Sequence, residues 1–239
     1  MRSKRLFSKF LFVILLLTSI YIIYNLSSDK VDAKAKDLSV IKLDNYNDKT
    51  VSIKDLQQEY DNDEITGILN IPDTELSVIV TKTTDNNKYL TTNIYGQKDV
   101  IGNPFMDYRV DIEKSPSLLI YGHNSKTYDV PFKELENYYG KDYYDDHPYI
   151  ELITEQGLWR YKIFSVYVET KDWYYLNIDF ANKDDWFAHL EKLKSNSMYD
   201  TGENISPDDK ILILQTCSFK KGFENYNKKY LLIIARRVY

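Results

Sequence analysis

The sequence predicts a mostly β protein with helical insertions, arranged as a closed or nearly closed barrel. Short apolar or alternating segments, about eight in number, are separated by turn residues and read as strands. Between some of these predicted strands, apolar residues recur at helical spacing and predict short helices. Hydrophobic residues make up 43% and aromatic residues 15% of the 239 positions, which is enough for the core of one ordinary domain.

The first 46 residues are predicted to lie outside this barrel. Residues 10–26 (FLFVILLLTSIYIIYNL) carry no charge, and roughly 17–25 such residues span a bilayer. Four basic residues, Arg2, Lys4, Arg5 and Lys9, precede this run. By the positive-inside rule, the N-terminus stays in the cytoplasm and the residues after the run lie outside the membrane. We therefore predict a cytoplasmic segment over 1–9, a single-pass signal anchor over 10–26, a stalk over 27–46, and one domain over 47–239.

Two alternatives to the anchor are open. A cleaved signal peptide would use the small residues AKA at 33–35, but these lie far beyond the apolar run, which is itself long for a signal core. A buried helix of the globular domain is the other alternative, and the basic flank argues against it.

The first half of the domain holds one helix and three strands. A cap at Ser52 and helical spacing up to Tyr60 predict a short helix. Two strands then meet at a Pro-Asp turn at 72–73, and a polar loop follows them. The apolar segment SLLIY after this loop predicts a strand that ends at Gly122.

The second half alternates between helices and strands. Residues 130–147 predict a short helix followed by a loop, and Tyr149–Thr154 and Leu158–Thr170 predict a hairpin. Residues 184–199 predict a helix, with acids first and lysines later as the helix dipole favours. The segments KILILQT and KYLLIIARRVY predict the last two strands.

One cysteine, Cys217, stands at the end of an apolar strand and cannot form an internal disulfide. An inert core cysteine is the structural alternative. His123 also follows an apolar strand, so both side chains fit one rim of a barrel, where a thiol and a base could meet. His147 lies in a loop and is predicted to be on the surface, and His189 is predicted to be on the solvated face of its helix.

Several classes of function are disfavoured. The net charge of −5 argues against nucleic acid as a partner. One cysteine and three dispersed histidines give no spacing typical of a metal site. Eight glycines form no phosphate-binding loop.

Five motifs occur in the order found in sortases, and the chain resembles that family from about Ile65 to Tyr239. The motifs are GILNIPDTELSVIV (Gly67–Val80), DNNKYL (Asp85–Leu90), NPFMDYR (Asn103–Arg109), YGHN (Tyr121–Asn124) and LQTC (Leu214–Cys217). The predicted helix over 184–199 and the helical segment before the barrel look like class B features.

The resemblance implies an eight-stranded sortase-type β-barrel and a membrane-anchored cysteine transpeptidase of a Gram-positive bacterium. Cys217 would attack the Thr carbonyl in a C-terminal sorting signal of a secreted protein, and His123 would act as acid and base. The acyl group would pass from the thioester to an amine, usually of a peptidoglycan precursor. Class B signals tend to be Asn-Pro-x-Thr or Ser-Pro-x-Thr, and no cofactor is implied.

One position departs from the family pattern. Sortases carry an arginine in the last strand, and here the matching position is Tyr230. Arg236 lies six residues further along, roughly 20 Å away in a regular strand. Either Tyr230 donates the hydrogen bond itself, or the enzyme is impaired, or another cation substitutes, such as Lys228, Lys229 or Arg109.

The sequence also suggests which residues line the substrate groove, and it leaves three other functions open. Gln215, Thr216 and Asn124 are candidate substrate-groove residues, and Asp129 or Glu134 could orient the imidazole. The alternatives are a weak sortase-like scaffold that binds sorting signals or pilin subunits, a pilus-assembly sortase that uses a pilin lysine, and an inert barrel.

Overall fold

The structure is a computed structural model that describes Thr18, Tyr21 and residues 52–239. The predicted cytoplasmic segment, anchor and stalk lie outside the described residues, apart from those two positions. Within the described residues, no helix has the length and apolar character needed to cross a membrane.

Eight strands close into a barrel, as the sequence predicted, in the order β1-β2-β3-β4-β7-β8-β6-β5. Two neighbouring pairs, β2–β3 and β4–β7, are parallel, whereas the other pairs are antiparallel. The strands are β1 (Ile65–Asn70), β2 (Ser77–Lys82), β3 (Phe105–Met106), β4 (Ser117–Tyr121), β5 (Tyr149–Thr154), β6 (Gly157–Glu169), β7 (Ile211–Cys217) and β8 (Tyr230–Arg237).

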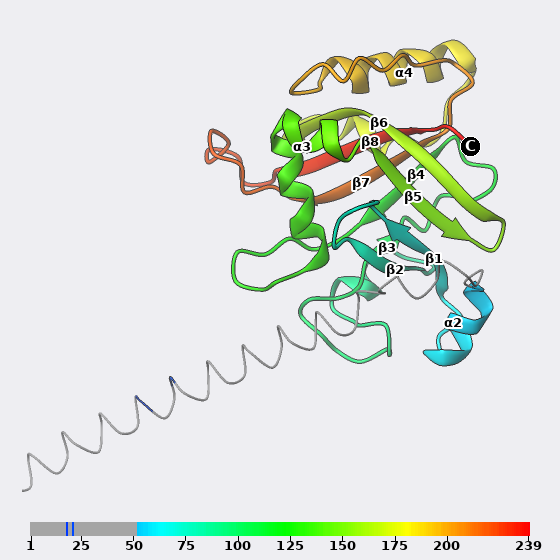
Figure 1. The fold of residues 1–239 in the computed structure, drawn as a ribbon, viewed down its shortest axis with the longest axis vertical. Coiled ribbons are helices and arrows are strands. Elements are labelled where there is room, and N and C mark those ends of the chain that lie inside the picture. The colour runs from blue at the N-terminus through cyan, green and yellow to red at the C-terminus, as the bar shows by residue number, and fades with distance from the viewer. Residues whose placement is uncertain (1–17, 19–20, 22–51) are drawn as a thin grey trace, which may run out of the picture.

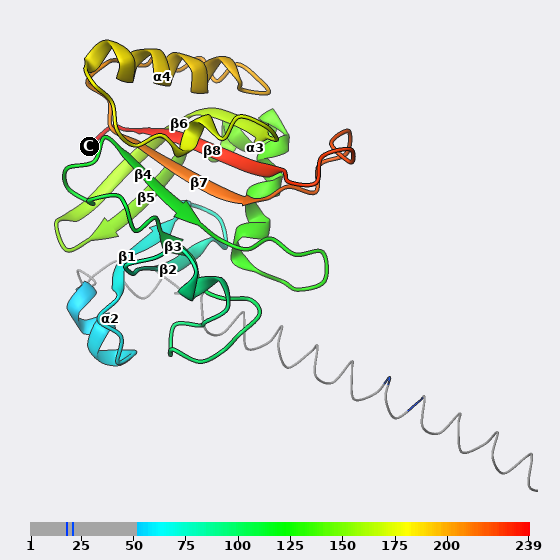
Figure 2. The ribbon, with the colours of Figure 1, turned by 180° about the vertical axis from the view of Figure 1, so that it is seen from behind.

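Helices flank this barrel on two opposite sides, α4 at the top and α2 at the bottom in both views (Figures 1 and 2). The β7–β8 loop projects to one side, where the chain also leaves β4, and the C-terminus lies on the other side. The described helices are α2 (Ile53–Glu59), η2 (Lys88–Leu90), η3 (Pro131–Tyr139), α3 (Lys141–Asp146), η4 (Tyr174–Leu176) and α4 (Lys183–Ser195).

The parallel pair β4–β7 determines where the functional side chains lie. Their apolar stretches, Leu118–Ile120 and Ile211–Leu214, are buried, as is usual for parallel strands covered on both faces. Because the two strands run in the same direction, their C-terminal ends meet at one rim, with Tyr121 beside Gln215.

Four elements differ from the sequence-based expectation. The two-residue strand β3 was missed because it is too short to show an alternating pattern. Helix α3 forms where a loop was predicted, since Tyr144 is buried and donates its hydroxyl to the carbonyl of Thr201 at 3.0 Å. Tertiary packing there outweighs weak local propensity. The single-turn helices η2 and η4 were also missed.

The prediction that His189 is solvated is wrong. His189 is fully buried on α4, and the rings of Tyr174, Phe180 and Trp186 surround it at centroid distances of 4.7–5.6 Å. Neither ring nitrogen has a hydrogen-bond partner. His189 follows Trp186 by three residues and therefore lies on the apolar face of the helix. Burial lowers the pKa of His189 to about 4.

This burial predicts an acid-sensitive stability. The unfolded chain takes up a proton on His189 near its ordinary pKa of 6.5, whereas the folded chain resists it until about 4. Stability therefore falls as the pH drops through this window, by about 2 kcal/mol between about pH 7.5 and about pH 5. Urea unfolding of wild type and His189→Leu at both pH values measures the difference. An equal pH dependence in the two proteins would contradict the assignment.

Candidate active site

Cys217 is the last residue of β7 and is half-buried at the rim. Burial raises the pKa of the Cys217 thiol above its usual value. The thiol is therefore protonated at neutral pH, and because the thiolate is the reactive form, nucleophilic attack requires a nearby base.

His123 lies two residues beyond the end of β4, held between two residues that bond to β7. The Gly122 N–H donates to the carbonyl of Gln215 at 3.1 Å, and Asn124 Nδ2 donates to the carbonyl of Cys217 at 2.9 Å. A Cβ on Gly122 would approach the Phe132 ring to 2.4 Å, so only glycine fits this turn. The structure thus brings His123 and Cys217 to the same rim, as the sequence predicted.

The imidazole of His123 has a partner that the sequence did not indicate. Its Nε2 lies 2.9 Å from the backbone carbonyl oxygen of Leu90, the last residue of η2. Glu134, one of the expected orienting groups, instead accepts the hydroxyl of Tyr143 at 2.5 Å. A backbone carbonyl carries no signal in residue identity, which explains why the sequence analysis missed it.

Tyr230, where the sequence resemblance leads us to expect an arginine, lies directly opposite Cys217 in the antiparallel β7–β8 pair. Directly opposed residues in a sheet present their side chains to the same face. Burial and the neighbouring Cys217 both raise the pKa of the Tyr230 phenol, so it stays protonated and able to donate. The Trp173 ring packs against it at a centroid distance of 5.3 Å.

Trp173 itself has a left-handed backbone with φ of 47°. This conformation is strained for a bulky side chain and persists only where the surroundings enforce it. The strain lies beside the Tyr230 phenol, at the start of η4.

Arg236 lies far from the site, as expected, and two of the three cations considered as substitutes for arginine, Lys229 and Arg109, are bound elsewhere. Arg236 pairs with Ile211 at the far end of β7 and forms an ion pair with Glu203. Lys229 Nζ donates to the carbonyl of Phe223 at 3.0 Å. Arg109 also has its own partners, Asp107 and the carbonyl of Leu176.

The residues predicted to line the substrate groove differ in burial and in hydrogen-bond partners. Gln215 is half-buried on the same face of β7 as Cys217, and its Oε1 accepts the hydroxyl of Tyr175 at 2.5 Å. Thr216 is buried, and its hydroxyl donates to the carbonyl of Gly122 at 2.8 Å. Together with Asn124, Thr216 therefore holds the ends of β4 and β7 against each other.

An ion pair supports the rim beneath these residues. The carboxylate of Asp107 is fully buried and accepts hydrogen bonds from Arg109 at 2.9 and 2.7 Å and from the Tyr121 hydroxyl at 2.6 Å. Burial alone would raise the pKa of Asp107, but the hydrogen bonds from Arg109 and Tyr121 outweigh it and lower the pKa. Because Arg109 also donates to the Leu176 carbonyl at 3.3 Å, it connects the barrel to η4.

The rim thus offers a thiol, an imidazole and a protonated phenol. In the described part of the chain, no three His, Cys, Asp or Glu side chains form a group that could hold a metal ion. This set of groups is suited to covalent acyl transfer, with the thiol as nucleophile and the imidazole as proton carrier.

Comparison with known proteins agrees with this chemistry. The family model of the sortase domain matches residues 69–238. The sortase B of Listeria monocytogenes is 35% identical over 175 residues, which cover 72% of this chain and 69% of the relative. The sortase B of Staphylococcus aureus is 28% identical over 157 residues, which cover 65% of this chain and 64% of the relative.

Solved structures show the same fold. The sortase B structure from Listeria monocytogenes has a TM-score of 0.67 at 30% identity and covers 77% of this chain and 99% of its own. That of Clostridium perfringens sortase B has a TM-score of 0.71 at 24% identity and covers 79% and 100%. The chain therefore belongs to the sortase family of cysteine transpeptidases, and its relatives are class B sortases.

Proposed function

We propose that this protein is a membrane-anchored class B sortase that joins secreted proteins to an amine of the cell wall. One observation carries the proposal: Asn124 and Gly122 bond to the end of β7, which holds His123 at the rim where Cys217 lies. A thiol beside a base on a sortase barrel supports cysteine transpeptidation.

In the first half of the reaction, His123 accepts the proton of Cys217, and Sγ attacks the carbonyl carbon of the Thr in the sorting signal. The oxyanion that forms takes a hydrogen bond from the Tyr230 hydroxyl. The peptide bond after Thr then breaks, and the imidazolium of His123 gives its proton to the leaving amine. The products are an acyl-thioester on Cys217 and the released C-terminal peptide.

In the second half, an amine of the acceptor attacks the thioester carbonyl, and His123 takes the proton that the amine loses. The C–S bond breaks, Cys217 leaves as the thiolate and recovers a proton, and a new amide joins the two molecules. The same three groups serve both halves because the second half reverses the first with a different amine.

The signal and the location are further parts of the proposal. The resemblance to class B sortases implies a signal of the Asn-Pro-x-Thr or Ser-Pro-x-Thr type. The uncharged run over 10–26, preceded by basic residues, would hold the enzyme in the membrane with residues 47–239 outside. The acceptor would be a peptidoglycan-precursor amine, with a pilin lysine as the alternative.

The covalent intermediate is the first test. We expect full-length protein, incubated with peptides that contain Asn-Pro-x-Thr, Ser-Pro-x-Thr or Leu-Pro-x-Thr, to gain the mass of the acyl fragment in intact-mass spectrometry. Hydroxylamine should release the adduct because it cleaves thioesters. Cys217→Ala should show no adduct with any peptide.

A folded protein that binds a signal peptide equally well with and without Cys217, and never forms an adduct, would favour the scaffold function instead. Adduct formation only with Leu-Pro-x-Thr would retain the sortase chemistry but reject the class B signal.

The role of Tyr230 gives a second test. Tyr230→Phe keeps the ring against Trp173 but removes the donor, so we expect kcat to fall about 100-fold with little change in KM, as loss of one oxyanion donor does in another protease. The measurement is steady-state cleavage of a quenched fluorescent signal peptide. The matched control is Tyr226→Phe, which removes a phenol from the β7–β8 loop beside Phe223. If both variants cleave at the wild-type rate, the phenol is not the donor.

A further inference from the structure

The hydrogen bond between His123 and Leu90 specifies which nitrogen of the imidazole carries a proton. A backbone carbonyl oxygen can only accept, so Nε2, 2.9 Å away, must be the donor. In the neutral ring, the lone pair that accepts a proton is then on Nδ1. The carbonyl of Leu90 thereby selects one of the two tautomers of His123.

The backbone around Leu90 is held in place on both sides. The Leu90 N–H donates to the carbonyl of Asn87 at 3.1 Å, and the carbonyl of Tyr89 accepts the N–H of Asn103 at 3.0 Å. Gly102, with φ of +64°, packs so closely on this turn that a Cβ there would lie 2.1 Å from the Tyr89 oxygen. The direction of the Leu90 carbonyl is therefore determined by the loop.

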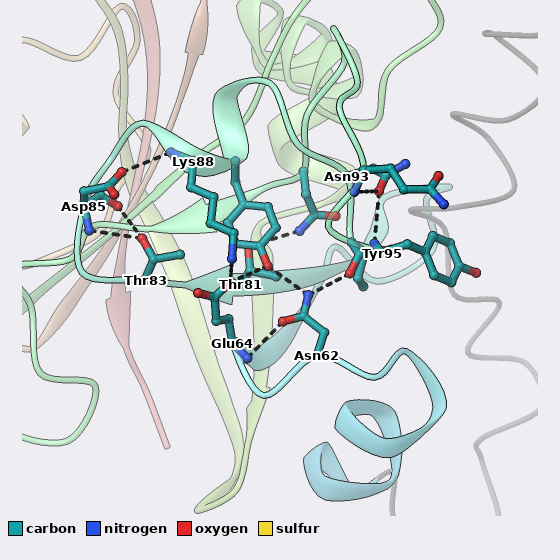
Figure 3. Close-up of polar contacts among 12 residues, drawn as sticks. Asn62, Glu64, Thr81, Thr83, Asp85, Lys88, Asn93 and Tyr95 are labelled. Carbon is teal, nitrogen blue, oxygen red and sulfur yellow. Dashed lines mark hydrogen bonds and ion pairs between the residues drawn. The ribbon is translucent and has the colours of Figure 1, made fainter.

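The side chain of Tyr89 anchors this loop to the start of β1. It is almost completely buried, and its hydroxyl donates to Glu64 Oε2 at 2.8 Å and accepts from Asn62 Nδ2 at 2.8 Å. Figure 3 shows the side chains of Asn62 and Glu64 close together, with the Lys88 ammonium on the Glu64 carboxylate. Burial and the Glu64 carboxylate raise the pKa of Tyr89, so the phenol remains a donor.

Asn62 also bonds to a second point of the loop between β2 and β3. Its Nδ2 also donates to the carbonyl of Ile94 at 2.7 Å, and its Oδ1 accepts the N–H of Glu64 at 3.0 Å. One amide thus joins the segment before β1 to two points of the β2–β3 loop. These contacts are buried or half-buried, so they lose little strength to solvent.

We propose that the Leu90 carbonyl is the positioning group of the active-site histidine. It holds His123 as the Nε2–H tautomer and leaves Nδ1 to exchange protons with Cys217 and the substrate amine, and the Asn62–Glu64–Tyr89 cluster keeps it in place. The assignment of Nδ1 as the proton carrier rests on the proposed transpeptidation, whereas the tautomer itself does not.

A carbonyl in this role has a defined electrostatic effect. Like the carboxylate of a protease triad, it fixes the ring and accepts a hydrogen bond from the imidazolium. Because it carries no full charge, it stabilises the imidazolium less than a carboxylate would.

The tautomer can be measured directly on the resting enzyme. Full-length protein labelled with ¹⁵N at its histidines has three imidazoles, and His123→Gln identifies the signals of His123. Two-bond proton–nitrogen correlation spectra at neutral pH should show a protonated Nε2 and an unprotonated Nδ1. An Nδ1–H tautomer, or an even mixture, would overturn the proposal without bearing on whether the enzyme transfers acyl groups.

The role of the Asn62–Glu64–Tyr89 cluster is tested by Tyr89→Phe, which keeps the buried ring and removes the hydroxyl. We expect kcat to fall roughly tenfold with KM nearly unchanged, because a misplaced base affects the chemical step, and we expect the His123 spectrum to shift toward a tautomer mixture. Tyr95→Phe is the matched control, since Tyr95 belongs to the same loop and its hydroxyl points away from Asn62 and Glu64 in Figure 3.

The outcomes separate the two proposals. A wild-type spectrum and wild-type kcat in Tyr89→Phe would show that the cluster does not position His123. Absence of turnover in the wild type, combined with the expected tautomer, would reject the proposed function and leave the assignment of His123 intact.

Discussion

The parallel pairing of β4 and β7 is the constraint on which the rest of the site depends. Two parallel strands end at the same rim, so residues that follow one strand meet residues that end the other. His123 and Cys217, far apart in sequence, come to the same rim for this reason. Apolar side chains hold the pair in the core, and hydrogen bonds from Gly122, Asn124 and Thr216 fasten the two ends.

A tyrosine at position 230, where the resemblance to sortases leads us to expect an arginine, would change how charge is stabilised at the rim. A guanidinium would stabilise both a thiolate and an oxyanion through its charge, whereas a phenol offers one neutral donor. Burial already disfavours the thiolate of Cys217. In the proposed reaction, the positive charge would then come from the imidazolium of His123, so the placement of that ring would matter more than in a site with an arginine.

The sequence was sufficient for the features that depend on residue type and spacing. Apolar runs identified β4 and β7, and the positions of His123 and Cys217 after those runs placed both at one rim. The burial of His189 was also available from its three-residue spacing to Trp186 and was overlooked. By contrast, the hydrogen bond from His123 to Leu90 involves a backbone atom, and its direction depends on a loop whose anchors, Asn62 and Tyr89, lie 27 residues apart. No local pattern encodes such a contact.

The half-buried position of Cys217 has a consequence for the lifetime of the enzyme. Oxidants attack the thiolate rather than the thiol, so a raised pKa slows conversion to sulfenic acid and beyond. Outside the membrane, where the proposed anchor would hold this domain, a permanently ionised cysteine would be exposed to oxidation between catalytic cycles. A thiol that ionises only when His123 takes its proton can remain reduced while it waits for substrate.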